Sequence, residues 1–165
     1  MIKSLVILLF SLSCKGTFVE SKVKMVLTGS VHGQLDPCGW KKNPLGGLSR
    51  KYVAIKQMRD DGLDPIVLDA GDMFFSTTSL NKNNLESEKH RCETMLSGYE
   101  KIGCDGLNIG KYELLGGLTY LKSLEQKHPK IPFISANIRD KKTQDLIFSP
   151  YRIIKKENLS IGVIG

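Results

Sequence analysis

The chain has 165 residues, of which 41% are hydrophobic and 25% are charged. This composition excludes an intrinsically disordered chain and a collagen-like fibre, and the length suits one ordinary domain or part of a larger one. The formal net charge of +7 comes from 24 Lys and Arg against 17 Asp and Glu, and the basic residues are scattered. Because a nucleic-acid-binding surface usually gathers basic residues beside aromatic ones, we expect a solvated surface and no nucleic-acid partner.

The first 21 residues have the pattern of an export signal and a polar spacer. Lys3 supplies a positive start, and residues 5–10 form an apolar run that is too short to span a bilayer. Ser11, Leu12 and Ser13 come next, and Cys14 then resembles a bacterial lipoprotein cleavage site, where the cysteine carries lipid and attaches the protein to a membrane. The alternative is a plain secreted protein cut a few residues later. We therefore predict a signal and spacer over 1–21, a folded domain over 22–165, and a periplasmic or cell-surface location.

The chain holds four cysteines, Cys14, Cys38, Cys92 and Cys104, and none forms a C-x-x-C pair. A zinc ribbon or a thioredoxin-like centre is therefore unsupported. If Cys14 carries lipid, three remain, and an odd number cannot all pair within the chain. The sequence does not choose which two would form a disulfide. A redox or metal role centred on Cys38 is a minor alternative.

Short apolar stretches alternate with helical patterns through the rest of the chain. The expected elements are strand 23–28, helix 47–59, strand 66–68, helix 86–102, strand 106–109, a helix through 118–124, strand 132–136, and strands 151–155 and 160–164. This alternation predicts an α/β layered fold with parallel strands, whose ligands bind where the strands end. The last residues still follow an apolar strand pattern, so we expect the domain 22–165 to be incomplete at its C-terminus.

Polar motifs follow three of the predicted strands. They are residues 28–33 (TGSVHG), 68–72 (LDAGD) and 108–113 (NIGKYE), with GGLSR at 46–50, SANI at 135–138 and IGVIG at 161–165. In order and spacing they resemble the metallophosphoesterase (calcineurin-like) superfamily, in its 5′-nucleotidase and UDP-sugar hydrolase branch. The resemblance implies the N-terminal half of a metallophosphoesterase α/β sandwich, built of βαβαβ layers.

The resemblance also implies a chemistry. In that family two neighbouring divalent cations clamp a phosphate ester and activate the attacking water, and several carboxylate and imidazole groups hold them. By this resemblance His32 and Asp72 are retained metal ligands, while Glu113 and Asn137 are supporting residues. No cofactor is assigned outright, and Mn²⁺, Zn²⁺ or a similar metal is expected only if the site is functional.

Three family positions are substituted. Ser30 stands where the family has a ligand Asp, Lys111 where it has a ligand Asn, and Tyr112 where it has the catalytic His, so no catalytic residue is assigned. The ammonium of Lys111 is a poor metal ligand and would repel a cation. We expect it to take the place of a metal and pair with the carboxylate of Asp72. The alternative is that Lys111 points to solvent and the pocket binds nothing.

Each retained residue has a purely structural interpretation as well. His32 can hydrogen-bond its own loop, Asp72 can cap the next segment through backbone N–H groups, and Asp69 can support its loop. Glu113 can be an ordinary exposed acid at a helix start. His128 falls in a helical segment and is expected at the surface.

Two functions remain after this comparison of motifs. The first is an exported 5′-nucleotidase-like protein with a degenerate metal centre, weak or non-catalytic, that binds a nucleotide or another phosphate-containing ligand. The second is an active metal-dependent phosphohydrolase of the 5′-nucleotidase type that acts on nucleotides. A Gly-His-x-His run beyond Gly165 would favour the enzyme.

Overall fold

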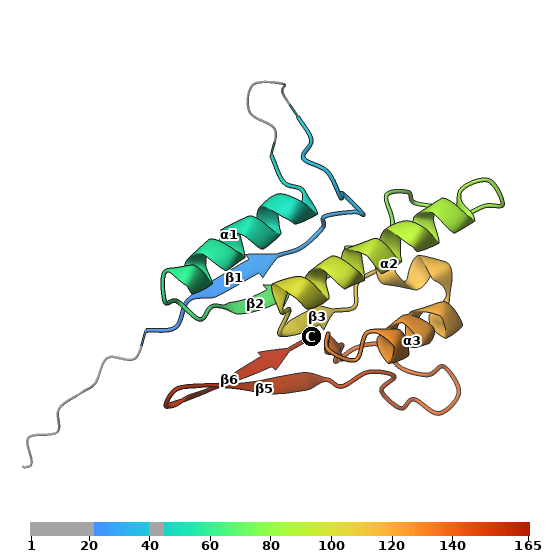
Figure 1. The fold of residues 1–165 in the computed structure, drawn as a ribbon. Helices are drawn as coiled ribbons and strands as arrows, with labels where there is room; N and C mark the ends of the chain where they lie inside the picture. The colour runs from blue at the N-terminus through green and yellow to red at the C-terminus, as the bar shows by residue number, and fades with distance from the viewer. Residues whose placement is uncertain (1–21, 40–44) are drawn as a thin grey trace, which may run out of the picture.

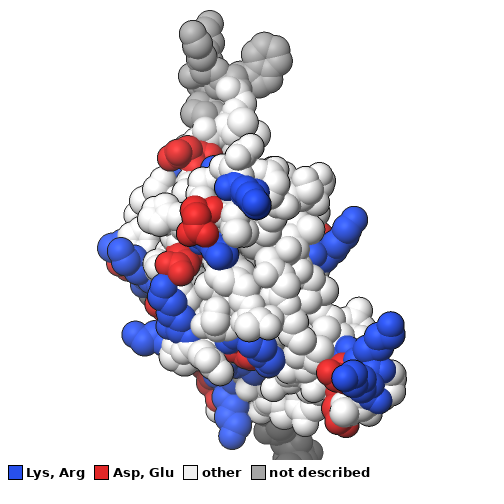
Figure 2. All heavy atoms as spheres, turned by 90° about the vertical axis from the view of Figure 1, so that its right-hand side faces the viewer, with Lys and Arg blue, Asp and Glu red and all other residues white. Residues whose placement is uncertain are grey.

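A computed structural model describes residues 22–39 and 45–165 (Figure 1). The predicted export signal and Cys14 lie outside these residues. Within them, no helix is both long enough and apolar enough to cross a membrane. On the face shown in Figure 2, Lys and Arg side chains are interspersed with Asp and Glu.

Four strands form one parallel sheet in the order β1-β2-β3-β4. Their bounds are Met25–Thr28 for β1, Ile66–Asp69 for β2, Gly106–Asn108 for β3 and Phe133–Ile134 for β4. Thr28 lies beside Asp69, so β1 and β2 end level with each other. The prediction of an α/β fold with parallel strands is confirmed.

The helices come between these strands. Their bounds are Leu48–Asp60 for α1, Leu85–Ile102 for α2 and Leu118–Lys127 for α3. A 3-10 helix that the sequence did not predict, η1, spans Tyr112–Gly116. Gly103 caps the C-terminal end of α2, and its left-handed φ of 77° suits glycine. The two longer predicted helices agree with α1 and α2 to within a residue at each end.

The last two strands form a separate antiparallel hairpin. β5 spans Tyr151–Lys156 and β6 spans Leu159–Ile164, with Glu157 in a left-handed conformation at the turn. Figure 1 shows this hairpin on the side of the four-stranded sheet away from α1 and α2. The predicted pair of closing strands is confirmed, and each strand extends one residue nearer the turn than predicted.

The strand order explains why the two faces of the sheet differ. When parallel strands follow one another in chain order, right-handed crossovers place their connecting helices on one face. Val26 packs into the core on that face, whereas Leu27, which points the other way, is 68% exposed. The hairpin covers only part of the second face, where Leu27 and Ile164 line a shared cavity of about 260 Å³.

The main core lies between the helices and the face of the sheet that they cover. Its fully buried members include Ile55, Val67, Met95, Leu96 and Leu107. Aromatic side chains continue the core toward the hairpin, since the Phe133 and Phe148 ring centroids are 6.4 Å apart. This packing fixes the strands, and with them the loops at their carboxyl ends.

Candidate functional site

The loops that follow β1 and β2 lie side by side at the carboxyl edge of the sheet. The backbone N–H of Ser30 donates to the carbonyl of Gly71 at 2.8 Å, and the N–H of His32 donates to the carbonyl of Asp72 at 3.0 Å. These bonds continue the pairing of the two strands beyond their ends. The first and second sequence motifs therefore meet, as the parallel arrangement predicts.

Glu113 joins the third motif to the second. Its carboxylate is fully buried, which corrects the expectation of an exposed acid. Oε1 accepts the N–H groups of Met73 and Phe74 at 2.6 and 3.3 Å, and Oε2 accepts those of Asp72 and Gly110 at 2.8 and 2.9 Å. Burial raises the pKa of Glu113, and these N–H donors act against that rise. Both oxygens are engaged by backbone, so Glu113 acts as a clamp between loops.

Asp72 makes the reciprocal contact with the third loop. Its Oδ1 accepts the backbone N–H of Tyr112 at 2.9 Å, so it does cap a following segment, although a distant one in the chain. A Cβ added to Gly110 would lie 2.5 Å from this Oδ1. Only glycine permits so close an approach of the two loops.

Three non-glycine residues of the motifs have left-handed backbone. The φ angles are 53° at Ser30, 44° at His32 and 54° at Asp72. Asp and His are among the residues that tolerate this region best, and serine is not. Such conformations cost about 1–3 kcal/mol each and gather at functional sites. The left-handed backbone at these three positions is therefore typical of a functional site.

His32 packs against the residue that replaces the family's catalytic histidine. The ring centroids of His32 and Tyr112 are 4.5 Å apart, with the rings tilted by 53°. The Nδ1 atom of His32 is buried and has no hydrogen-bond partner. The backbone N–H of His32 donates a hydrogen bond to the neighbouring loop, whereas its imidazole Nδ1 makes none. This nitrogen is therefore available to a ligand.

Lys111 does not occupy the expected place. Its side chain is exposed, and none of the ion pairs formed by the described residues joins it to Asp72. The expected Lys111–Asp72 pair is therefore wrong, and the solvent-facing alternative holds for the side chain. The physical reason is that Asp72 turns its Oδ1 toward a backbone N–H at the start of η1, where Lys111 is the N-cap residue.

The remaining predicted residues have local roles. Asn137 is exposed after β4 and accepts a hydrogen bond from the Ser135 hydroxyl at 2.9 Å. Asp69 supports its loop as expected, because its Oδ1 accepts the N–H of Gly71 at 3.0 Å. His128 is buried, which corrects the surface expectation: the C-terminal end of α3 packs it near Glu100.

The three cysteines within the described residues are all free. Cys38 is exposed, whereas Cys92 and Cys104 are buried. Burial raises the pKa of the Cys104 thiol to about 12 and that of Cys92 still further. No disulfide forms among these three residues.

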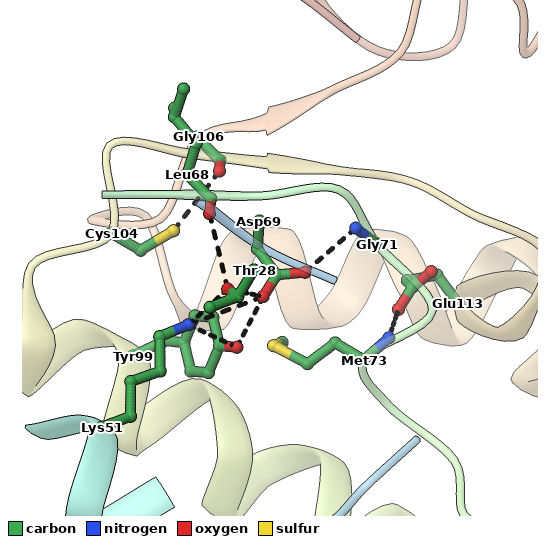
Figure 3. A network of polar contacts seen from close by, with 10 residues as sticks. All are labelled: Thr28, Lys51, Leu68, Asp69, Gly71, Met73, Tyr99, Cys104, Gly106 and Glu113. Atoms are coloured by element: carbon green, nitrogen blue, oxygen red, sulfur yellow. Dashed lines mark hydrogen bonds and ion pairs between the residues drawn. The ribbon is translucent and has the colours of Figure 1, made fainter. Parts of the chain in front are cut away.

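A buried polar network under the site was missed by the sequence analysis (Figure 3). The ammonium of Lys51, from α1, donates to the Thr28 hydroxyl at 2.6 Å and to the Tyr99 hydroxyl at 2.8 Å. Both hydroxyls donate in turn to Asp69 Oδ2, at 2.5 and 2.6 Å, and the ammonium lies 3.6 Å from that oxygen. In sequence, Lys51 looks like any lysine on a helix, so no local signal could have found it.

A cavity of about 370 Å³ borders this network and the first loop. Its lining includes Thr28, Val31, Gln34, Gly47, Lys51 and Tyr99. Burial lowers the pKa of Lys51, while Asp69 acts in the opposite direction. The lysine thus stands between a solvent-accessible hollow and a fully buried carboxylate.

The described residues alone do not supply the ligand set of a two-metal centre. In 22–39 and 45–165, no group of three or more His, Cys, Asp or Glu side chains is placed to hold a metal ion. His32 and Asp72 remain as candidate ligands, and one oxygen of Asp72 already accepts a backbone N–H. Two adjacent cations need several anionic or imidazole ligands to offset their repulsion.

Comparisons with known proteins agree with the motifs. No family model matches the sequence. A 5′-nucleotidase of Vibrio parahaemolyticus is 30% identical over 149 residues, covering 87% of this chain and 24% of that protein. The protein UshA of Escherichia coli is 29% identical over 150 residues, covering 87% and 25%. This chain therefore spans about a quarter of the length of these relatives.

A solved structure shows the same architecture. The NAD nucleotidase NadN of Haemophilus influenzae matches with a TM-score of 0.67 at 22% identity, covering 86% of this chain and 26% of that one. At this identity the likeness establishes a shared fold. The two proteins therefore share this α/β architecture.

Proposed function

Because this chain belongs to the 5′-nucleotidase branch of the metallophosphoesterase superfamily and corresponds to its N-terminal part, we propose that it is an exported phosphoesterase-like protein with a degenerate metal centre. Its strand-end loops bind a nucleotide or another phosphate-containing ligand, and any hydrolysis there is weak. The chemistry of the family depends on bound metal ions, and this site departs from the family pattern in its metal-binding residues.

The observation that carries the proposal is the ligand deficit at the strand ends. The side chains at Ser30 and Lys111 are not the carboxylate and amide that the family pattern has there, and both are exposed. Tyr112 carries a phenol where the family pattern has an imidazole, and a phenol is a poorer proton donor than an imidazolium at neutral pH. Loss of general acid–base catalysis of this kind costs about 10²–10⁴-fold in rate.

One observation favours the competing function, an active metal-dependent nucleotide phosphohydrolase. His32 keeps an unpartnered, buried Nδ1, and both His32 and Asp72 keep left-handed backbone. An imidazole held in this way is available to a ligand. The two functions therefore differ in whether the rest of the ligand set can be assembled around these residues.

Metal binding and turnover of the full-length protein test the proposal. We expect elemental analysis after incubation with Mn²⁺ and Zn²⁺ to give less than two metals per chain, and only slow hydrolysis of a generic phosphodiester and of nucleoside 5′-monophosphates. His32→Ala serves as the comparison for metal bound at this site. Near-stoichiometric binding of two metals, together with turnover typical of an enzyme, would overturn the degenerate-site proposal in favour of its competitor.

Export is the second part of the proposal and rests on residues 1–21, with their positive start, apolar run and Cys14. We propose a periplasmic or cell-surface location with membrane attachment through a lipidated Cys14. Mass spectrometry of the N-terminus of protein from its native membrane tests this. A mature chain that starts at another residue, and whose first residue is unmodified, would contradict the proposed lipid anchor.

A further inference from the structure

Lys51 donates hydrogen bonds to two hydroxyl groups beneath the site, those of Thr28 and Tyr99. It lies on α1, yet its ammonium reaches the ends of β1 and β2. Surface lysines rarely contribute much through ion pairs. Burying an ammonium group costs free energy of folding unless its partners are well placed. Here the partners belong to the hydrogen-bond network that includes Asp69.

We propose that Lys51 is a positioning residue that sets the geometry of the strand-end site through Thr28 and Asp69. Through Thr28 it acts on the first loop, which starts at the next residue. Through Asp69 it acts on the second loop, because Asp69 Oδ1 accepts the N–H of Gly71. Gly71 in turn accepts the N–H of Ser30, so both loops are fixed at one point.

The geometry at Gly71 makes this point sensitive. Its φ is 95°, and an added Cβ would lie 2.6 Å from the carbonyl oxygen of Asn108, at the end of β3, and 2.9 Å from the backbone nitrogen of Gly110 in the third loop. The turn at Gly71 therefore sits where all three loops meet. A small rotation of the Asp69 carboxylate would move the Gly71 N–H and, one residue later, the backbone of Asp72.

Tyr99 completes the arrangement from α2. Its hydroxyl accepts a hydrogen bond from the Lys51 ammonium and donates one to Asp69, so it links the ammonium to the carboxylate. The ammonium also lies 3.9 Å from the Tyr99 ring centroid, a cation–π distance. The helices α1 and α2 are thereby tied to the same carboxylate below the site.

The cavity beside Lys51 permits a direct test of the ammonium itself. In Lys51→Ala, the space of the lost side chain joins a cavity of about 370 Å³ that already borders Thr28 and Tyr99. A small primary ammonium such as n-propylammonium can enter and donate the lost hydrogen bonds. Tetramethylammonium has the same charge and no N–H donor, so it is the matched control ion.

The readout is NMR of the full-length protein. The signals followed are those of the His32 imidazole and of the Gly71 and Asp72 amides. We expect Lys51→Ala to shift these signals and to leave the exposed His90 imidazole unmoved. n-Propylammonium should restore most of the shift, and tetramethylammonium should not. Lys56→Ala is the control variant, because Lys56 is an exposed lysine of the same helix that also pairs with an aspartate.

Tyr99→Phe keeps the test decisive if Lys51→Ala does not fold. It removes only the relaying hydroxyl, and we expect shifts at Gly71 and Asp72 in the same direction and smaller. Shifts no larger than those of Lys56→Ala in the folded variants would overturn the inference. Equal recovery with both ammonium ions would also overturn it, because charge or filled volume would then suffice. The inference rests on the proposed function only in taking these loops as the site, and its readout needs neither metal nor turnover.

Discussion

The carboxylate of Glu113 accepts the backbone N–H of Asp72 at 2.8 Å, and the carboxylate of Asp72 accepts the N–H of Tyr112, the residue just before Glu113, at 2.9 Å. The second and third loops therefore hold each other through a reciprocal pair of side chains. The two loops are held together in this way although the Lys111 side chain has no part in the contact. Glu113 serves the fold, and its retention does not by itself indicate catalysis.

The clamp predicts a large loss of stability on truncation of Glu113. Glu113→Ala leaves four backbone N–H groups without their acceptor, and each buried unsatisfied donor costs about 1–3 kcal/mol. We expect the free energy of unfolding to fall by at least about 3 kcal/mol, with Glu113→Gln intermediate because one oxygen remains. Urea unfolding measures this change. Glu86→Ala is the control, since that side chain is 85% exposed and should change stability by no more than about 0.5 kcal/mol.

A second prediction concerns pH and Lys51. Burial lowers its pKa below the ordinary 10.5, so between the two values the unfolded chain holds a proton that the folded chain has released. The free energy of unfolding contributed by this group therefore rises with pH through that window. The groups that face the ammonium are Asp69, Tyr99 and Cys104. The raised pKa values of Tyr99 and Cys104 lower stability above their ordinary values near 10 and 8.5, in the wild type and in a Lys51 variant alike.

Lys51→Met isolates this contribution. We expect the unfolding free energy of the wild type, minus that of Lys51→Met, to increase from about pH 8 to about pH 10. This range lies below the ordinary lysine and tyrosine pKa values. Urea titrations at fixed ionic strength give the two curves. Parallel curves for the wild type and Lys51→Met would mean that the ammonium is not held at a lowered pKa.

The third prediction concerns the thiols. Cys38 is exposed, whereas burial raises the pKa of Cys104 to about 12. Against an ordinary thiol near 8.5, that leaves roughly a thousandfold less thiolate at neutral pH. We expect iodoacetamide to label Cys38 in the native protein and to reach Cys92 and Cys104 only in denaturant. Peptide mass spectrometry assigns the labels, with Cys38→Ser as control, and native labelling of Cys104 at the rate of Cys38 would contradict the burial.

Much of this fold could be predicted because apolar runs and helical periodicity are local signals. The strand over Ile66–Asp69 is bounded by a turn and a glycine, and α2 has a continuous apolar stripe. The closeness of the motifs also followed from parallel topology. Strand lengths were less well predicted: β4 forms only at Phe133–Ile134, because Ser135 already bonds Ser149 outside the sheet.

The site was harder to predict because its contacts join residues far apart in the chain. No local pattern distinguishes a buried Glu113 from an exposed acid at a helix start, since its burial depends on N–H groups about forty positions away. The orientation of Lys111 depends on where η1 begins, and η1 itself has no periodic signature. The Lys51–Asp69 contact requires both strand register and the packing of α1.

The last prediction concerns the second face of the sheet, which the hairpin only partly covers. Leu27 is 68% exposed and Ile164 is 78% exposed, although both line the same cavity between the two sheets. An apolar face of this kind favours association, and we expect the 165-residue chain to self-associate as concentration rises. Burying one such side chain contributes about 1.5–3 kcal/mol, so Ile164→Lys or Leu27→Lys should weaken association roughly 10- to 100-fold. Val53→Lys is the matched control, because Val53 is 62% exposed on α1, away from this face. Sedimentation velocity over a concentration series separates these cases, and a wild-type chain that stays monomeric with a sharp, cooperative unfolding transition would contradict the prediction.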